Sequence, residues 1–190
     1  RSYKPAVEGD SHQVNLAIEA LLAAKRPVFY VGGGVIQADA EDSLRALVKA
    51  ANVPVTSTLM GLGAYPGSDP QSLGMLGMHG TYEANMTMHE TDLIFALGAR
   101  FDDRVTNSPD KFSPKATIVH LDVDSASVDK IIRADIALVG DAGWALNALW
   151  DAYQARDAER DPSAKEKQQQ DMAKWWEQID QWRSAHGLNH

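Results

Sequence analysis

Five short apolar runs, each followed by a polar or glycine-rich loop, constrain the fold of this chain more than any other feature. They cover residues 28–31, 53–56, 92–97, 117–121 and 136–139. Continuous apolar runs of this length are typical of strands that are buried on both faces of a parallel sheet. Helical patterns separate most of these runs. The alternation predicts an α/β fold, a parallel sheet with helices on both faces, and residues 73–75 are a candidate sixth strand.

The same patterns predict where several helices begin. Ser11 is the expected cap of a first helix that ends near Lys25, and Asp39 is the expected cap of the next one. Apolar residues at 128, 131 and 132 predict a short helix, and residues 144–153 predict a closing helix.

Composition bounds the class of protein. The chain has 190 residues, of which 44% are hydrophobic and 23% charged, as expected for one soluble domain with a sizeable core. Its formal net charge of -8 argues against a nucleic-acid-binding protein and a polybasic membrane anchor. It has no cysteine, which excludes a disulfide and a thiolate metal site. No apolar run approaches the ~20 residues that span a bilayer. The chain opens at Arg1 without a methionine, which is typical of a segment from inside a longer protein.

We divide the chain into three parts. Residues 1–10 are predicted to be a linker, residues 11–153 a central α/β domain, and residues 154–190 a charged linker and an amphipathic helix leading to a missing domain. Trp175, Trp176 and Trp182 fall at helical spacing and need a partner surface. The helix either folds back on this domain or docks on a missing neighbour, and we expect the second arrangement.

Two loops carry the residue types of a ligand site. The run 92–97 ends at Gly98 and is followed by two arginines and two aspartates within 100–104. Ligands of open α/β sheets lie at the carboxyl ends of the strands, where an arginine can bind a phosphate or a carboxylate. The alternative is a surface salt-bridge cluster, in which each pair contributes under ~1 kcal/mol.

The glycines at 32–34 also follow a predicted strand, and this outline is typical of a nucleotide-binding βα unit. Gln37 takes the place of the third glycine of the dinucleotide fingerprint, so the fingerprint is incomplete. The alternative is a tight turn that binds no ligand.

Several motifs together establish a resemblance. They are VGGG at 31–34, STLMGLG at 57–63, LGMHG at 76–80, GARFDDRV at 98–105 and VHLDVD at 119–124. In this order and spacing, the chain resembles the central domain of the large catalytic subunit of acetohydroxyacid synthases (acetolactate synthases). These are thiamine-diphosphate enzymes that also hold FAD. The resemblance is close over 27–149 and looser at both ends. It implies a Rossmann-like middle domain of six strands between two thiamine-diphosphate-binding domains.

The resemblance also implies an extended FAD across the carboxyl ends of the strands. Backbone access to the dinucleotide would come from Gly33 and Gly34. The flavin side would meet Thr58, Leu59 and Met60, and the same groove would be lined by Leu76, Gly77, Met78 and His79. The ribityl-pyrophosphate region would be held by Gly98, Arg100, Asp102, Arg104 and Val105. The adenosine end would be held by Asp122, Val123, Asp141 and Ala142. Candidates for the substrate channel are Asp103, Arg104 and Met78. The resemblance implies no catalytic residue and no metal ligand within this fragment.

The implied parent enzyme is a transferase of branched-chain amino-acid biosynthesis. It would decarboxylate pyruvate on thiamine diphosphate and add the product to a second 2-ketoacid. Thiamine diphosphate and Mg²⁺ would be held by flanking domains of the same subunit, so the fragment alone is expected to be inactive. The expected parent is a cytoplasmic bacterial homo-oligomer; an organellar parent and a regulatory subunit stay open. No nucleic-acid or membrane partner is expected.

Two other classes stay open. One is the structural middle domain of another thiamine-diphosphate decarboxylase or carboligase that binds no flavin. The other is an NAD(P)-dependent dehydrogenase domain, against which the incomplete fingerprint argues.

Overall fold

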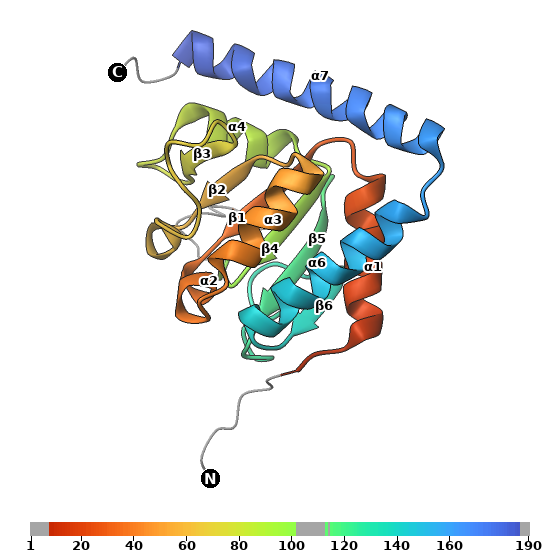
Figure 1. Cartoon of the computed structure of the whole chain (residues 1–190). Helices are drawn as coiled ribbons and strands as arrows, with labels where there is room; N and C mark the ends of the chain where they lie inside the picture. Colours follow the sequence, from red (N-terminus) through yellow and green to blue (C-terminus); the bar gives the residue numbers. More distant parts are fainter. Residues whose placement is uncertain (1–7, 102–112, 114, 187–190) are drawn as a thin grey trace.

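A computed structural model describes residues 8–101, 113 and 115–186 of the chain (Figure 1). Its centre is a six-stranded sheet with the order β3-β2-β1-β4-β5-β6, in which every neighbouring pair is parallel. The strands are β1 (Pro27–Val31), β2 (Val55–Ser57), β3 (Ser72–Met75), β4 (Leu93–Leu97), β5 (Thr117–Asp122) and β6 (Ile136–Val139). The predicted parallel α/β fold is confirmed, including the sixth strand at 72–75.

The helices of the described residues are α1 (Ser11–Ala23), α2 (Gly33–Gln37), α3 (Glu41–Ala51), α4 (Tyr82–Glu90), α6 (Ala142–Ala158) and α7 (Pro162–His186), with a short 3-10 helix η1 (Leu59–Gly61). None of them is both long enough and apolar enough to cross a membrane.

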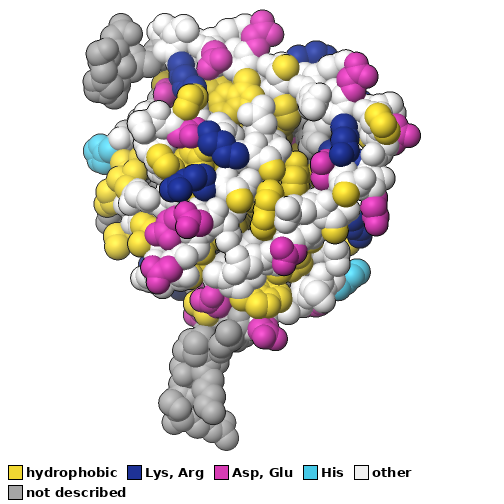
Figure 2. Space-filling view, in the orientation of Figure 1, with side chains coloured by type: hydrophobic (Ala, Val, Ile, Leu, Met, Phe, Trp, Pro, Cys, Tyr) yellow, Lys and Arg dark blue, Asp and Glu magenta, His cyan; other side chains and the backbone are white. Residues whose placement is uncertain are grey.

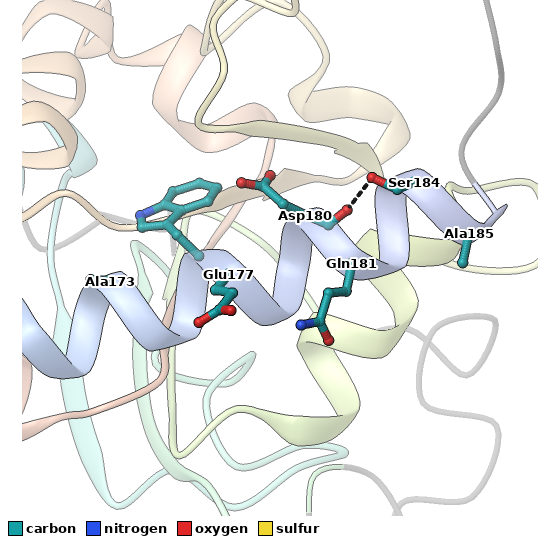
Figure 3. Close-up of a pocket in the computed structure, with 7 residues that line it drawn as sticks. Ala173, Glu177, Asp180, Gln181, Ser184 and Ala185 are labelled. Atoms are coloured by element: carbon teal, nitrogen blue, oxygen red, sulfur yellow. Dashed lines mark hydrogen bonds between the residues drawn. The ribbon is translucent and has the colours of Figure 1, made fainter.

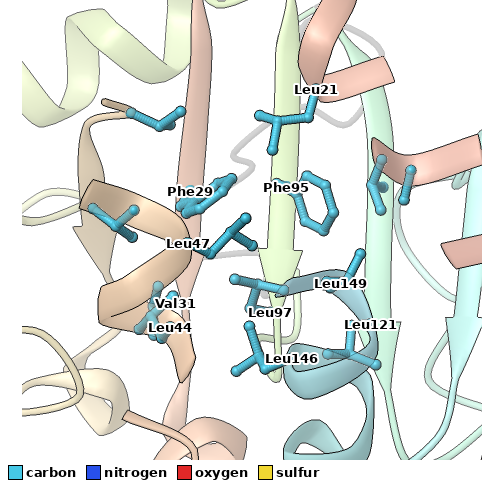
Figure 4. Close-up of a cluster of buried hydrophobic side chains, with 14 of the residues drawn as sticks. Leu21, Phe29, Val31, Leu44, Leu47, Phe95, Leu97, Leu121, Leu146 and Leu149 are labelled. Carbon is cyan, nitrogen blue, oxygen red and sulfur yellow. The ribbon is translucent and has the colours of Figure 1, made fainter. Parts of the chain in front are cut away.

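Successive strand residues point to opposite faces of the sheet, and both faces carry a buried apolar cluster. Phe29 and Phe95 face one side, where their rings meet edge to face at 5.3 Å between centroids beneath α1, α3 and α6 (Figure 4). Tyr30 and Ala96 face the other side, in a second buried cluster that includes Met88 of α4. Burial on both sides explains why these strands are continuous apolar runs.

The strand order reverses between β1 and β4, and this reversal marks a particular position at the carboxyl ends of the strands. From β1 the chain builds outward through β2 and β3, and it then returns to place β4 on the other side of β1. The two connections therefore leave in opposite directions at the carboxyl ends of β1 and β4. Open α/β sheets bind ligands at this position.

Helix α7 lies across the opposite edge, at the amino ends of the strands (Figure 1). The Trp175 indole Nε1 donates to Pro27 O at 3.0 Å, and the Arg183 guanidinium donates to Ser72 O at 2.9 Å. Trp175 and Ile179 are buried in a cluster with Leu73. The apolar face of this helix thus packs on this chain, where the sequence analysis expected a neighbouring domain.

Two predicted helix caps are wrong. The cap of α1 is Asp10, whose carboxylate accepts from the His12 amide at 2.8 Å, one residue before the expected Ser11. Asp39 has a φ of 49°, a left-handed conformation, whereas a capping residue is extended. Helix α3 begins after Ala40 instead, with no side-chain cap.

The short helix expected at 128–132 is also absent, because this stretch of the described chain forms successive turns. Asp129 has a φ of 62° and accepts from the Ala134 amide at 2.7 Å. An aspartate that bonds to nearby backbone amides in this way competes with helix formation.

Candidate functional site

The loops after β1 and β4 pack on each other through their glycines. The Gly32 amide donates to Leu97 O at 2.9 Å, and the Gly34 amide donates to Gly98 O at 3.1 Å. A Cβ on Gly32 would lie 2.1 Å from Gly98 O, closer than any side chain tolerates. Gly98 itself has a φ of 56°, which favours glycine. The most direct role of these glycines is therefore to let the two loops meet at the reversal of strand order.

Gly33 faces the loop after β2 rather than β4. A Cβ there would lie 3.0 Å from Met60 O, at η1. Thr58 caps η1, since its Oγ1 accepts from the Gly61 amide at 2.9 Å. Three loops of the predicted site, those after β1, β2 and β4, are thus in direct contact at the carboxyl edge.

Arg100 projects from this edge. Its neighbours Ala99 and Phe101 are both buried in the second core cluster, while Arg100 is exposed. The backbone on both sides of Arg100 is thus anchored in the core, while the Arg100 side chain reaches solvent. The position suits recognition of an anionic ligand group, because a guanidinium binds phosphate or carboxylate through two parallel hydrogen bonds.

The next two strands each end in a half-buried carboxylate. Asp122 is the last residue of β5, and one of its oxygens accepts from the Asp124 amide at 2.9 Å. Asp141 follows β6 and caps α6, with one oxygen accepting from the Gly143 amide at 2.9 Å. The Gly140 amide donates to Asp122 O at 3.1 Å, which brings the two loops together. These bonds each use one carboxylate oxygen, and the second oxygen of each group is the candidate ligand atom.

The residues beside these carboxylates differ in what they can offer. Val123 is 41% exposed, whereas Ala142 is 7% exposed and lies in the first turn of α6. Ala142 can meet a ligand only through its backbone.

Large apolar side chains are exposed on the loops after β2 and β3. Leu59 is 69% exposed, Met60 74% and Met78 90%. Figure 2 shows hydrophobic side chains at the left margin, where Figure 1 places the segments around β3. Exposed apolar groups that gather on one surface mark a binding region.

The turn between β3 and α4 has a support that the sequence analysis missed. The Asn85 amide group accepts from the Gly77 amide at 3.1 Å and donates to Gly77 O at 3.0 Å. Asn85 thereby fixes the turn that presents Met78 and His79, both exposed. No local signal identifies it, because an asparagine in a helix has no distinct spacing. Leu76, by contrast, is 7% exposed and faces the core, so only its backbone can line a groove.

Two hollows lie elsewhere, beside α7. One of about 770 Å³ runs along the outer surface of α7 and is lined by Ala173, Trp176, Glu177, Asp180, Gln181, Ser184 and Ala185 (Figure 3). The other, of about 590 Å³, lies between α4 and α7 and includes Arg26, Glu90 and Trp182. Both are at the amino side of the sheet, away from the predicted ligand loops. A hollow lined by one helix alone is an open surface and not a cofactor groove.

Four predicted site residues, Asp102, Asp103, Arg104 and Val105, lie outside the described residues. The described remainder of the predicted set comes from the loops after β1 to β6, which parallel pairing places along one edge of the sheet.

Comparison with known proteins agrees with this arrangement. Residues 14–149 match the family model described as "Thiamine pyrophosphate enzyme, central domain". The chain is 47% identical to the acetolactate synthase isozyme 3 large subunit of Escherichia coli strain K12, with 100% of this chain and 32% of that protein covered. It is 45% identical to the acetolactate synthase large subunit of Haemophilus influenzae, with 97% of this chain and 31% of that protein covered.

A third relative, the acetolactate synthase large subunit of Buchnera aphidicola from Schizaphis graminum, is 45% identical over 100% of this chain and 32% of its own length. The chain therefore spans about a third of the length of the curated relatives that it matches. With its all-parallel six-stranded sheet and a match that covers most of its length, this chain belongs to the family of thiamine pyrophosphate enzyme central domains.

Proposed function

We propose that this chain is the central domain of an acetolactate synthase large subunit and that it binds FAD along the carboxyl edge of its sheet. The observation that carries the proposal is the identity of 47% to one such subunit across the whole chain. The parent would decarboxylate pyruvate and join the product to a second 2-ketoacid, as an early step to branched-chain amino acids.

The described residues fit an extended dinucleotide. An exposed guanidinium at Arg100 suits the pyrophosphate, and half-buried carboxylates at Asp122 and Asp141 suit ribose hydroxyls. Exposed Leu59, Met60 and Met78 offer apolar contact to a flat ring system. Gly33, Gly34, Thr58, Gly77, His79, Gly98, Val123 and Ala142 would complete the walls, with Leu76 contributing backbone only.

The residues of this chain would bind and orient, not react. FAD performs no net redox in the proposed reaction, and thiamine diphosphate supplies the carbanion chemistry from the flanking domains, together with Mg²⁺. Arg104, Asp103 and Met78 would border the substrate channel, where the Arg104 guanidinium would hold the carboxylate of the incoming 2-ketoacid.

One observation favours a second candidate, a structural middle domain that binds no flavin. The space beside Gly32, Gly34 and Gly98 is filled by the neighbouring loop, so these glycines have a packing role that needs no ligand. The exposed Arg100 and the exposed methionines are what the second candidate leaves unexplained.

Titration of FAD into the full-length subunit distinguishes the two candidates. If the chain binds FAD as proposed, Arg100→Ala should weaken the FAD affinity about tenfold or more relative to the wild type. The reason is that a hydrogen bond to a charged group contributes roughly 1.5–3 kcal/mol. Arg45→Ala on α3 is the matched control, since it removes an exposed arginine paired with Asp42 and leaves the carboxyl edge intact. Equal FAD affinity of the wild type and Arg100→Ala would remove Arg100 from the site. A wild type that takes up no FAD would favour the structural candidate.

A further inference from the structure

His120 occupies a position in the sheet that packing alone does not explain. It lies within β5 and is 1% exposed. Its neighbours Val119 and Leu121 belong to the core cluster on the other face of the sheet. The imidazole therefore points into the second cluster, which is otherwise formed by apolar side chains and Tyr30. A buried polar ring has to be explained by the contacts that it makes.

The imidazole makes two contacts with the segment that follows β4. Its Nε2 lies 2.9 Å from Ala99 O. Its ring meets the Phe101 ring edge to face, with centroids 5.1 Å apart and an angle of 74° between the planes. His120 thus contacts the residues on both sides of Arg100.

The hydrogen bond fixes the tautomer of the neutral ring. A backbone carbonyl can only accept, so Nε2 carries a proton, and in the neutral ring Nδ1 then has none. Among the described residues, Nδ1 has no hydrogen-bond partner. Burial lowers the pKa of His120, against the opposing effects of the Ala99 bond and of the Asp122 and Asp129 charges, so the ring is neutral at pH 7. An apolar residue would fill this space without leaving a buried nitrogen unpaired.

These contacts act on the direction of Arg100. The segment 98–101 is held at its first residue, because Gly98 packs on Gly34. Ala99 and Phe101 are held inward by His120 and by the second cluster. With both neighbours anchored in the core, the exposed Arg100 between them is held in the loop that follows β4 at the carboxyl edge.

We propose that His120 is a positioning residue that holds residues 98–101 so that Arg100 faces a bound dinucleotide. The inference rests on the proposed function for its ligand, and it assigns to His120 a role in cofactor affinity without contact to the cofactor. It acts through a neutral imidazole that donates to Ala99 O.

Two substitutions separate the hydrogen bond from the packing. His120→Phe keeps a ring against Phe101 and removes the donor, while His120→Gln keeps an amide N–H near the place of Nε2. In the full-length subunit, FAD affinity should fall roughly three- to tenfold in His120→Phe, the effect of one neutral hydrogen bond. His120→Gln should restore most of it. If His120→Phe fails to fold, His120→Asn replaces it, because its shorter amide cannot reach Ala99 O.

A double-mutant cycle with Arg100→Ala tests the route of the effect. If His120 acts through Arg100, His120→Phe causes no further loss of FAD affinity once Arg100 is alanine. Additive losses would show that His120 supports the domain generally, and they would overturn the positioning role. Wild-type FAD affinity in His120→Phe would overturn it as well.

Amide hydrogen exchange of residues 98–101 gives a readout that needs no FAD. Exchange there should increase in His120→Phe relative to exchange in β4, and His120→Gln should restore the protection. Unchanged exchange in a folded His120→Phe would overturn the inference. If the wild type binds no FAD but exchange changes as expected, the proposed cofactor is wrong and the structural hold by His120 stands.

Discussion

At the residue scale, the contact between Gly32 and Gly98 gives the sharpest expectation. In Gly32→Ala the new Cβ would lie 2.1 Å from Gly98 O and 2.5 Å from the Ala99 Cα, and both are backbone atoms. We expect a loss of about 1–3 kcal/mol in the free energy of unfolding, as in other overpacked sites. Gly67→Ala is the matched control, because no atom lies within 4 Å of a Cβ there. Denaturant unfolding of both variants measures the difference, and equal stabilities would contradict the close packing of the two loops.

Burial of His120 should also make the free energy of unfolding depend on pH. Its pKa is lowered in the folded chain by burial, so the unfolded chain binds the proton first as the pH falls. The free energy of unfolding should therefore decrease as the pH falls below about 6.5, the ordinary pKa of histidine. The decrease should be at most ~1.4 kcal/mol per pH unit. The carboxylates of Asp122 and Asp129 reduce the effect by favouring the charged ring.

The measurement is the stability of the wild type minus that of His120→Phe between pH 7 and pH 5. This difference should decrease on acidification, since only the wild type carries the buried group. The subtraction cancels the contributions that the other titrating residues make to the free energy of unfolding in both proteins. A difference that is constant with pH would show that burial does not shift this histidine.

Individual residues were the least predictable part of the sequence. Asp39 and Ser11 are both ordinary capping residues, yet a one-residue shift gives the cap to Asp10, and a φ of 49° removes Asp39 from the role. The resemblance implies that the Gly34 backbone meets the dinucleotide, and this stays a prediction. The contact of Gly34 with Gly98 depends on the neighbouring strand, and a local pattern does not contain that information.

At the scale of elements, prediction was far better, and the reason is burial. Strands such as 93–97 are buried on both sides, so their sequence is apolar throughout. The apolar run ends where the chain leaves the sheet and enters a loop. Helix α7 shows the limit of this reasoning. Periodicity identifies Trp175 as part of an apolar face, but it does not say that the covering surface is Leu73 and Pro27 of the same chain.

Trp175 should therefore stabilise this domain itself. It is 2% exposed and donates to Pro27 O, so Trp175→Ala should lower the free energy of unfolding by about 3–5 kcal/mol. Trp176→Ala is the comparison on the same helix, because Trp176 is only half-buried and its bond to Asn52 O is exposed. We expect a clearly smaller loss there. Unchanged stability in Trp175→Ala would mean that α7 does not dock on this surface in solution.

At the scale of the whole molecule, the two edges of the sheet have different tasks. The amino edge is covered by α7, while the carboxyl edge presents Arg100, Asp122 and the exposed methionines. In the described residues, this separation leaves the carboxyl edge, where we propose that the cofactor binds, uncovered by α7. The division follows from the parallel sheet, because all strands end on the same side.

The isolated chain should lack acetolactate synthase activity, and the reason is what one domain can hold. Making acetolactate needs thiamine diphosphate in its reactive form and a divalent cation that binds its diphosphate. We assign both to the flanking domains, and His79 cannot replace them because the carbanion chemistry belongs to the cofactor ring. The purified chain, supplied with pyruvate, thiamine diphosphate, Mg²⁺ and FAD, should give no acetolactate above a blank without protein. The full-length subunit should give it under the same conditions, which controls for the assay. Turnover by the 190-residue chain alone would overturn the assignment of the thiamine site to the flanking domains.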